Sequence, residues 1–443
     1  MDDFRAMADA IETEIRAGRM RPGTRLAPQR EFARQHGIAT STAARVYQEL
    51  ERRGLVSGEI GRGTFVLSGQ SAGPGGAEPG HSLIDLEANF PVLPEQALMV
   101  TRALSDLFRA GTLGGALQPV GPSGGRADRQ AVSQFLARDG WAPDPDDVLF
   151  TGSGRQGIAA AIAALVPSGQ HLGVEEFTYP VVKSLAHHLG VHLVPVRMDE
   201  HGLDPVDLAR VHREVGLHAV YLQPSLHNPL GTSMPPERRA ELSDMLVALD
   251  LTAIEDGVNC FLRVDGPLVA LAPAHTVYVD SLSKRVAPGL NLGIMITPQG
   301  LRETFAAAIR AGAWTAPGFA LAAAGTLIAD GTAARIVALK RTDAATRQAV
   351  VLERLAQFTL RADPAAYHAW WELPAPWQPE TFVAAAARHG IAISPAAAFA
   401  VPPTQARAVR LSNSSPSLTI LGQALDVLAD LARRTPEDSG LDY

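Results

Sequence analysis

The feature that most constrains the fold is a regular alternation of short apolar runs with helical patterns in the middle of the chain. The helical patterns include GIAAAIAALVPSG and PPERRAELSDMLVALD. The apolar runs have the composition of buried strands, and they are DVLFTG, QHLGVEEF, VHLVPVRM, LHAVYLQP, LTAIEDG and TVYVDSLS. Strands that alternate with helices predict an α/β fold with a mostly parallel sheet, whose ligands bind at the carboxyl ends of the strands.

Side chains suited to cofactor chemistry follow five of these predicted strands. They are Ser153, Gly154 and Arg155 after the first strand, Tyr179 after the second, Asn228 after the fourth, Asp256 at the end of the fifth, and Ser281, Ser283, Lys284 and Arg285 after the sixth. A helix start with a guanidinium can hold a phosphate. A carboxylate can keep a pyridine nitrogen protonated, an amide can bind a phenolic oxygen, and a neutral lysine amine can form a Schiff base. The sequence therefore predicts a site for pyridoxal 5'-phosphate.

Lysine is rare in this chain, which makes a lysine at that edge informative. Of the 39 lysines and arginines, only Lys183, Lys284 and Lys340 are lysines. Each part of the predicted site also has an ordinary alternative: Asn228 could belong to a turn, Asp256 could cap a helix, and Lys284 could lie on the surface. Five such elements at successive strand ends, in this order, favour the cofactor site.

The first 66 residues show a different pattern, in which three short helices precede a hairpin. Apolar residues recur at helical spacing in FRAMADAIETEIRAG, a second helix is expected from about Pro28 to Gln35, and a third follows in IATSTAARVYQELERRG. Two short β-like pieces flank Arg62 in VSGEIGRGTFVL. This is the order of a winged helix-turn-helix, whose third helix enters the major groove of DNA. The segment carries 11 Arg against 9 Asp plus Glu, so a basic face is compatible with the net charge of −7 of the whole chain.

The stretch PGTRLAPQREFARQHGIATSTAARVYQELERRGLVSGEIGRGTFV resembles the GntR family of bacterial repressors. The resemblance implies DNA contacts, and together with the polar start of the third helix it predicts contacts from Arg30, Thr40, Ser41, Thr42, Arg45 and Arg62. Many relatives carry an arginine that reads a base where this chain has Thr40, which predicts a different operator. The alternative is a small helical cap with solvated arginines.

Composition divides the chain into four expected parts. Residues 68–83 are mostly Gly, Ala, Pro and Ser, which cannot bury apolar area and predict a flexible linker. The expected parts are a DNA-binding domain at 1–67, this linker, a large domain at 84–325 and a small domain at 326–443. The single cysteine, Cys260, excludes an intramolecular disulfide and a Cys-based zinc cluster, and no metal site is expected. Neither a signal core nor a membrane span is expected, so we predict a cytoplasmic protein.

The motifs after the strands resemble the type I aminotransferase family, and the whole chain resembles the MocR (GabR-like) subfamily of GntR regulators. The resemblance runs from DLEANFP to AVRLS and implies a large domain, a small α+β domain and a homodimer. It implies that Lys284 forms the Schiff base, that Asp256 binds the pyridine nitrogen and that Asn228 binds the phenolate. It further implies that Tyr179 stacks on the ring and that Arg410 clamps the carboxylate of an amino-acid ligand with its bidentate guanidinium.

Three accessory positions depart from the pattern that the resemblance implies. Asn291 stands where an arginine usually binds the cofactor phosphate, Asn259 lies where a tyrosine is usual, and Leu117 replaces a tyrosine given across the dimer. Loss of a charged phosphate contact weakens binding by about 1.5 to 3 kcal/mol. We expect Arg155 in the phosphate loop, or else Arg285, to supply the replacement charge.

These departures bear on the function that is predicted. Transamination needs full control of proton transfer, whereas a sensor needs only reversible aldimine exchange that shifts a conformational equilibrium. Changed accessory positions beside an intact Lys284, Asp256, Asn228 and Arg410 favour a transcriptional regulator, not an enzyme, that binds operator DNA and senses an amino acid or amine. The alternatives are an aminotransferase with a DNA-binding head and a regulator whose degenerate domain no longer binds pyridoxal phosphate.

Overall fold

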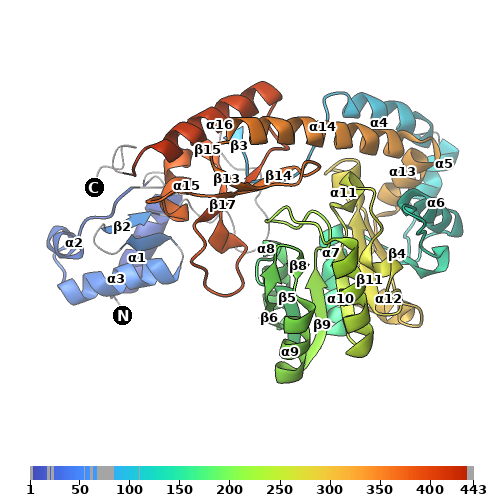
Figure 1. Ribbon diagram of the computed structural model, residues 1–443, viewed down its shortest axis with the longest axis horizontal. Coiled ribbons are helices and arrows are strands. Elements are labelled where there is room, and N and C mark those ends of the chain that lie inside the picture. The colour runs from blue at the N-terminus through green and yellow to red at the C-terminus, as the bar shows by residue number, and fades with distance from the viewer. Residues whose placement is uncertain are drawn as a thin grey trace.

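The computed structural model describes residues 3–16, 20, 24–53, 55–59, 63–66, 84–108 and 110–436. Two predictions lie outside the described residues, namely the DNA contact at Arg62 and the linker at 68–83. The described part of the chain forms an N-terminal helical unit with a hairpin, a large α/β unit and a small α+β unit (Figure 1).

The N-terminal unit has the predicted order of three helices and an antiparallel hairpin, which confirms the winged helix-turn-helix arrangement. Its elements are α1 (Asp3–Arg16), α2 (Gln29–His36), α3 (Thr40–Arg52), β1 (Val56–Glu59) and β2 (Gly63–Val66). Val46 and Leu50 of α3 are fully buried in one core with Ile11 of α1, because apolar residues recur at helical spacing on the facing sides. Gly37 ends α2 in the left-handed conformation that favours glycine, so the chain turns directly toward α3.

The large unit is built on a seven-stranded sheet with the strand order β4-β12-β11-β10-β9-β5-β6. The strands are β4 (Val148–Thr151), β5 (His171–Glu175), β6 (His192–Val196), β9 (Leu217–Leu222), β10 (Thr252–Asp256), β11 (Thr276–Ser281) and β12 (Gly293–Ile296). All six predicted strands form. The exception to the parallel arrangement is β12, which was not among the predicted strands and pairs antiparallel with β4 and β11. The mostly parallel sheet is thus confirmed.

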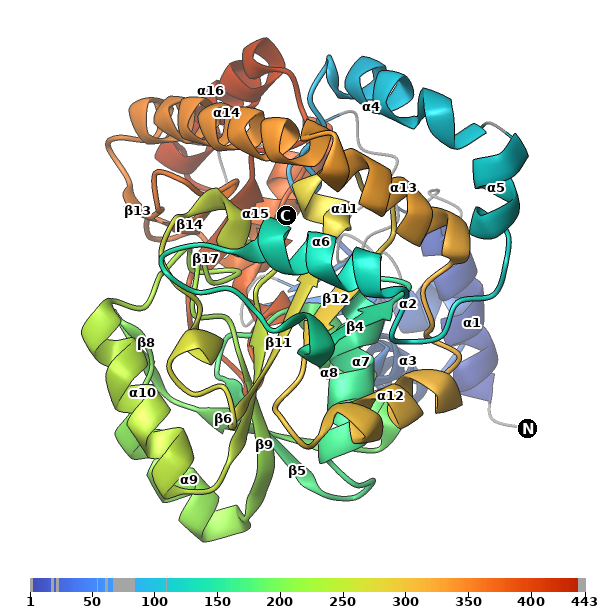
Figure 2. The same ribbon diagram turned by 90° about the vertical axis from the view of Figure 1, so that its right-hand side faces the viewer.

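Helices cover both faces of this sheet, as its alternating buried side chains require. The longer helices are α6 (Arg126–Leu136), α7 (Gly154–Leu165), α8 (Pro180–Leu189), α9 (Pro205–Val215), α10 (Pro236–Ala248), α12 (Arg302–Ala311), α13 (Gly318–Ala329) and α14 (Thr332–Arg354). Leu149 and Val279 pack with α7, α8 and α12, whereas Phe150 and Tyr278, one residue away, pack with α6, α13 and the start of α14. Helices α9 and α10 complete this second face beside β6 and β9 (Figure 2).

Several short elements connect this framework. They are α4 (Gln96–Leu104), η1 (Ser105–Phe108), α5 (Ala110–Ala116), η2 (Pro145–Asp147), β7 (Met198–Asp199), β8 (Gly202–Leu203), η3 (Cys260–Leu262), η4 (Leu268–Ala270) and α11 (Leu282–Arg285). Helices α4 and α5 lie against α13. The four-residue helix α11 directly follows β11, which places it at the carboxyl edge of the sheet.

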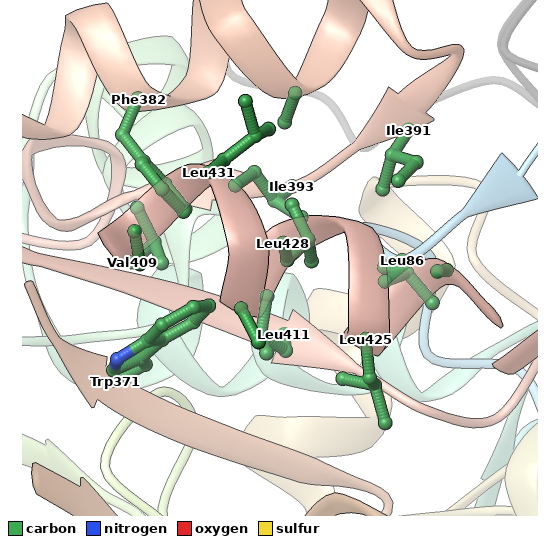
Figure 3. Close-up of a cluster of buried hydrophobic side chains, with 14 of the residues drawn as sticks. Leu86, Trp371, Phe382, Ile391, Ile393, Val409, Leu411, Leu425, Leu428 and Leu431 are labelled. Carbon is green, nitrogen blue, oxygen red and sulfur yellow. The ribbon is translucent and has the colours of Figure 1, made fainter. Parts of the chain in front are cut away.

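The small unit is a four-stranded antiparallel sheet in the order β13-β14-β17-β16, covered by helices. Its elements are β13 (Thr359–Arg361), β14 (His368–Glu372), α15 (Pro379–Arg388), β15 (Ile391–Ala392), β16 (Ser394–Pro395), η5 (Ala396–Ala398), β17 (Ala408–Ser412) and α16 (Leu418–Arg433). Trp371, Phe382 and Leu425 are fully buried in its core (Figure 3). The short strand β3 (Ile84–Asp85) pairs with β15, and Leu86 is buried in the same core. The first residues of the predicted large domain therefore pack with the small unit.

Helix α14 belongs to both units, as its course in Figure 1 shows. Ile336 near its start is buried with the large sheet, and Val351 near its end is buried in the small core. The change from the large core to the small core therefore falls between Ile336 and Val351 of α14, downstream of the boundary predicted at residue 326. Among the described residues, no single helix is long and apolar enough to cross a membrane, and α13 and α14 reach that length only as a pair bent by 77°.

Candidate functional site

The predicted cofactor residues gather at the carboxyl edge of the large sheet. These residues follow β4, β5, β9, β10 and β11. The last four of these strands are neighbours in the sheet, and β12 separates β4 from β11. Parallel strands that end at one edge bring together residues that are far apart in the sequence. The charges of Asp256, Arg155 and Arg410 influence the amine of Lys284, so charged groups of both units contribute to the electrostatic environment of this lysine.

Lys284 lies in α11, and its Nζ donates a hydrogen bond to Asn259 Oδ1 at 3.0 Å. Burial lowers the pKa of the Lys284 amine to about 8, because the charged form loses hydration, and the negative charge of Asp256 opposes this decrease. At that pKa, about a tenth of the amine is neutral at pH 7, against well under roughly a thousandth for an ordinary lysine. Only the neutral amine is a nucleophile, so this environment favours reaction with a carbonyl group.

Asp256 ends β10 and is almost completely buried, yet three donors surround its carboxylate. Tyr221 Oη donates to Oδ2 at 2.6 Å and Gln223 Nε2 donates to the same oxygen at 3.0 Å. The backbone N–H of Val258 donates to Oδ1 at 3.2 Å. Burial raises the pKa of Asp256, while the bond from Tyr221 and the charge of Lys284 oppose the rise. These contacts support an ionised carboxylate, the form that would pair with a protonated ring nitrogen.

Asn228 follows β9 and presents an amide whose bonding is incomplete. Its backbone N–H donates to Gln223 Oε1 at 3.0 Å, so one glutamine side chain bonds to both Asn228 and Asp256. The side-chain Oδ1 of Asn228 is buried and has no hydrogen-bond partner within the described parts of the chain. Since nearly all buried polar groups are hydrogen-bonded, this amide oxygen is free to accept a hydrogen bond from a bound molecule.

The loop between β4 and α7 carries three of the predicted cofactor residues. Ser153 caps α7, because its Oγ accepts a hydrogen bond from a backbone N–H of the first turn at 3.2 Å. Gly154 begins the helix at a point where a β-carbon would lie 3.1 Å from Ser281 Cβ, so the loop and the end of β11 approach closely. Arg155 Nε donates to Tyr179 Oη at 3.1 Å. The loop thus combines a helix start with a positive charge, which suits a phosphate.

Tyr179 precedes α8, and its ring belongs to the margin of the apolar core beneath the site. Burial raises the pKa of the Tyr179 hydroxyl, and the neighbouring charge of Arg155 opposes that rise. The hydroxyl is therefore neutral and serves as the acceptor for Arg155. The structure thus joins the aromatic side chain expected to cover the ring to the cation expected to bind the phosphate.

Ser281 and Ser283 bond within the protein. Ser281 Oγ accepts from the backbone N–H of Ser283 at 3.0 Å and so caps α11, while Ser283 Oγ donates to Asn291 Oδ1 at 3.1 Å. Asn291 is exposed and uncharged. These bonds order the helix that carries Lys284, and a role of the two serines as cofactor ligands stays a prediction.

Arg285 is turned away from the site. Its Nη2 pairs with Oδ2 of the buried Asp280 at 2.5 Å. The guanidinium also packs near the rings of Phe135 and Phe261, at 5.6 and 5.5 Å. A buried guanidinium that is already paired with a carboxylate has no reason to leave it for a phosphate. The geometry therefore does not support the expectation that Arg285 supplies charge to the cofactor.

Arg410 reaches the site from β17 of the small unit. Its Nη2 donates to Glu87 O at 2.6 Å and to Ser394 Oγ at 3.1 Å, and the guanidinium lies over the ring of Phe399 at 5.2 Å. Its buried Nε has no partner among the residues that the structure describes. Burial lowers the pKa of Arg410 to about 10, so the side chain remains positive at neutral pH. A guanidinium that is held in place and retains an unpaired donor matches the predicted carboxylate clamp.

Three residues of this site were not predicted to take part, namely Tyr221, Gln223 and Asn259. Gln223 directly follows β9, so the strand-end reasoning that selected Asn228 could have found it. Asn259 was noted only as a departure, yet its amide binds the amine of Lys284. Tyr221 lies within β9 opposite Ile254 of β10, and the sequence carries no signal that its hydroxyl meets Asp256.

The predicted DNA contacts lie at the surface of the N-terminal unit. Those within the described residues are exposed or half-buried, and they are Arg30, Thr40, Ser41, Thr42 and Arg45. The guanidinium of Arg45 in α3 lies 4.0 Å from the ring centroid of Phe4 in α1, a cation–π contact that holds this arginine against α1. Hydroxyl and guanidinium groups on this helix suit contacts with DNA phosphates and base edges.

Comparison with protein families gives two matches along the chain. Residues 81–419 match the family described as aminotransferase class I and II, and residues 5–66 match bacterial regulatory proteins of the gntR family. The chain is 29% identical to the uncharacterized HTH-type transcriptional regulator YdeF of Bacillus subtilis, over 97% of this chain and 94% of that protein. It is 28% identical to the vitamin B6 salvage pathway transcriptional repressor PtsJ of Salmonella typhimurium, over 65% and 66% of the two chains.

Solved structures show the same fold for the two larger units. An archaeal alanine:glyoxylate aminotransferase superposes with a TM-score of 0.73 at 21% identity, over 80% of this chain and 91% of that one. The α-aminoadipate aminotransferase LysN of Thermus thermophilus superposes with a TM-score of 0.71 at 20% identity, over 79% and 92% of the chains. At such identities the likeness concerns the fold, and the roles of individual residues rest on the geometry described above.

Proposed function

Because the chain belongs to the aminotransferase class I and II family and carries a GntR-type domain ahead of that region, we propose that it is a MocR-like transcription regulator that responds to an amino acid or amine. The winged helix binds operator DNA, and the aminotransferase-like units sense the effector through pyridoxal 5'-phosphate. Regulation, and not a catalytic cycle, is the primary activity. A DNA-binding regulator of this kind acts in the cytoplasm.

The residues at the sheet edge fit this cofactor. Pyridoxal phosphate supplies an aldehyde that reacts reversibly with primary amines, on a ring that is an electron sink. The residues that would hold it are Lys284 at the aldehyde, Asp256 at the ring nitrogen, Asn228 at the phenolic oxygen, Tyr179 on the ring face, and Arg155 with Ser153 and Gly154 at the phosphate.

The observation that carries the proposal is the setting of Lys284. Its partly neutral amine lies within the influence of Asp256 from the large unit and of Arg410 from the small unit. An amino acid bound with its amine beside Lys284 could place its carboxylate on Arg410. Binding then connects the two units, and a ligand that prefers one arrangement of them shifts the equilibrium between arrangements. Operator binding would change as the DNA-binding units are repositioned.

The test is covalent capture of the cofactor by the full chain. Incubation with pyridoxal phosphate, reduction with borohydride and peptide mass mapping are expected to place one phosphopyridoxyl group on Lys284 and none on Lys183 or Lys340. Operator fragments selected from a random DNA library then allow DNA binding to be measured with and without each amino acid. No capture at Lys284 would refute the cofactor, and DNA binding that ignores every amino acid and amine would refute the sensor.

Arg155→Ala is expected to weaken pyridoxal phosphate binding, because Arg155 replaces the charge missing at Asn291. The loss of one charged phosphate contact amounts to about 1.5 to 3 kcal/mol, roughly a ten- to hundredfold rise in Kd, measured by fluorescence titration. The complementary change Asn291→Arg should tighten binding. Unchanged cofactor affinity in Arg155→Ala would show that the phosphate is held by other groups.

A homodimer is proposed through the face formed by α4, the end of α5 and α13. Several large apolar side chains on or next to these elements are exposed, beside exposed charged residues such as Glu95 and Arg102, and they are Val92, Leu98, Phe108, Leu117 and Phe319. The rings of Phe108 and Phe319 lie 6.2 Å apart. An exposed apolar group of this kind on packed helices commonly marks an interface. A second copy of this chain is the expected occupant, since Leu117 stands where relatives reach into the partner's site.

Replacing Phe108 and Leu117 together by aspartate is therefore expected to convert the dimer to a monomer in sedimentation velocity. Two charges buried in an apolar interface lose their hydration without gaining partners. The matched control is Val206→Asp, which alters an exposed valine of α9 on a different surface and should leave the dimer intact. A double variant that sediments like the wild type would exclude this face as the interface.

An aminotransferase with a DNA-binding head is the second candidate, because Lys284, Asp256 and Arg410 are all in place. Turnover of an amino acid and a keto acid at rates typical of enzymes, roughly 1 to 1,000 per second, would favour it over the sensor. The third candidate, a regulator without the cofactor, would show no capture at Lys284 while operator binding persists.

A further inference from the structure

All three lysines of this chain bond within the protein, and two of them bind main-chain carbonyl oxygens. Lys284 binds the Asn259 amide, and Lys183 donates to Ala398 O at 3.1 Å and Ala400 O at 2.8 Å. Lys340 is completely buried, although lysine is among the residues least often found inside a protein. A buried lysine that the proposed chemistry does not use calls for a separate explanation.

The amine of Lys340 lies on the end of the helix that carries Lys284. Its Nζ donates to the carbonyl oxygen of Lys284 at 2.7 Å and to that of Val286 at 2.8 Å. Carbonyls at the end of a helix lack partners within the helix and carry a partial negative charge, so an ammonium group is well suited to them. Because Ser281 caps the other end, α11 is held at both ends.

Hydrogen bonds continue from Lys340 to the strand that carries Arg410. Tyr367 Oη lies 2.9 Å from both the carbonyl oxygen of Lys340 and Asp343 Oδ2, and its one proton is shared between these acceptors. The carbonyl oxygen of Tyr367 accepts from the backbone N–H of Asn413 at 2.9 Å. Asn413 directly follows β17, on which Arg410 lies. The path is short and continuous, and it leads from the main chain of Lys284 to the small unit.

Helix α14 packs on both units and can therefore transmit a movement of one unit to the other. Its first half, which includes Ile336, packs on the large sheet, and its second half, which includes Val351, packs in the small core. Lys340 lies between these two regions. A shift of the small unit that moves α14 or Tyr367 therefore acts on the Lys340 amine, which donates to the carbonyl oxygens of Lys284 and Val286.

We infer that Lys340 is a positioning residue that ties the backbone of Lys284 to the small unit, so that movement of the unit carrying Arg410 alters the placement and burial of the Lys284 amine. The inference rests on the proposed function for the role of Lys284 in sensing. It adds a physical link by which occupation of the carboxylate clamp and the state of this lysine influence each other, as coupling between two sites requires. Burial lowers the pKa of Lys340 to about 7, with Asp343 opposing the decrease, and an amine donates hydrogen bonds whether neutral or charged.

Because the chain has only three lysines, the effect of Lys340 on the Lys284 amine can be measured directly in the full chain without cofactor. NMR spectra of the chain labelled with ¹³C in its lysine side chains should show three signals. Variants that each lack one lysine assign these signals, and the change of each signal with pH gives the titration midpoint of that amine. In Lys340→Met, α11 loses its clamp and Lys284 gains water. Its titration midpoint is therefore expected to rise by about half a pH unit or more.

Lys183→Met is the matched control, because it also removes a lysine from two main-chain carbonyl oxygens. Both variants leave buried carbonyls without a donor and should lower the melting temperature. Only Lys340→Met is expected to move the Lys284 midpoint. An equal shift of the Lys284 midpoint in Lys183→Met would show that any loss of stability moves this midpoint, and it would overturn the inference.

Tyr367→Phe provides a second variant that leaves all charges in place and removes only the hydroxyl that lies between the Lys340 carbonyl oxygen and the Asp343 carboxylate. A smaller shift of Lys284 in the same direction is expected, which separates positioning from the loss of a nearby positive charge. It also decides the matter if Lys340→Met fails to fold. A Lys284 midpoint that stays unchanged in Tyr367→Phe overturns the link to the small unit, and one unchanged in a folded Lys340→Met overturns the positioning role.

These measurements need no pyridoxal phosphate, so their outcome is independent of the capture experiment. Failure of capture with a shifted Lys284 signal would refute the proposed cofactor and leave the role of Lys340 standing. Successful capture with an unshifted Lys284 signal would support the proposed cofactor and refute the role of Lys340.

Discussion

Lys284→Ala is expected to abolish capture of pyridoxal phosphate by borohydride reduction and to remove the effect of amino acids on operator binding. The other two lysines cannot replace it, because Lys183 and Lys340 direct their amines to main-chain carbonyl oxygens. Intact-protein mass spectrometry should show the added phosphopyridoxyl group in the wild type and none in the variant. Fluorescence anisotropy with an operator fragment should show DNA binding that persists and no longer responds to amino acids.

The control for this loss is Lys183→Ala, which removes a lysine and retains Lys284. It is expected to capture the cofactor to the same extent as the wild type. If Lys284→Ala still captured one group per chain, the reactive lysine would be a different one. If it lost capture and retained the amino-acid response, the sensing would be independent of the lysine.

The same variant reports how the burial of Lys284 affects stability. The pKa of this amine is about 8 in the folded chain against an ordinary 10.5, so the unfolded chain binds more protons between these values. The free energy of unfolding of the wild type should rise as the pH increases through this window, and the gain is absent below about pH 8. Lys284→Ala should lack this part of the rise, which denaturant titrations over a pH series would measure. A rise of the same size in both proteins would contradict the lowered pKa.

Arg410→Gln is expected to reduce the response to amino acids strongly while sparing amines that lack a carboxylate. Removing one partner of a buried charge pair weakens binding by about 2 to 5 kcal/mol, which corresponds to roughly a thirtyfold or larger rise in the effector concentration needed. The measurement compares an amino acid with the amine formed by removing its carboxyl group, in the operator-binding assay. The difference between the two ligands should largely disappear in the variant.

Arg407→Gln is the matched control for that experiment. Arg407 immediately precedes β17 and is exposed, so its replacement removes an equal charge from the same region without entering the site. It should respond to both ligands as the wild type does. Equal losses in the two variants would point to a long-range charge effect, and an unimpaired amino-acid response in Arg410→Gln would place the carboxylate elsewhere.

Local patterns predicted the fold well because they record how each segment is buried. The six apolar runs of the large sheet formed as expected, since a strand covered on both faces needs a nearly continuous apolar sequence. The strand β12 has a similar apolar composition and was still missed. Its antiparallel pairing with β4 and β11 depends on contacts between segments far apart in the chain, which a local pattern does not show. Residues 84–86 also pack with the small unit, which the distance along the chain conceals.

The site was predictable to the extent that its residues follow strands. Lys284, Asp256, Asn228, Arg155 and Tyr179 lie near the ends of strands that are neighbours in space, and parallel pairing brings such ends together. The direction of a side chain is a different matter. Arg285 adjoins Lys284 in the sequence, yet it points to the buried Asp280, because a fully desolvated guanidinium takes the nearest carboxylate.

By itself, the sequence determined the two kinds of domain, and it predicted the edge of the sheet for a ligand and Lys284 as the reactive lysine. Each of these follows from the spacing of apolar residues and from the polar residues that interrupt it, which are local properties. Only the tertiary structure decided that Asn259 holds the amine of Lys284, that Tyr221 supports Asp256, and that Lys340 binds the end of α11. These contacts join segments far apart in the chain, and their geometry depends on packing between units that no local pattern encodes.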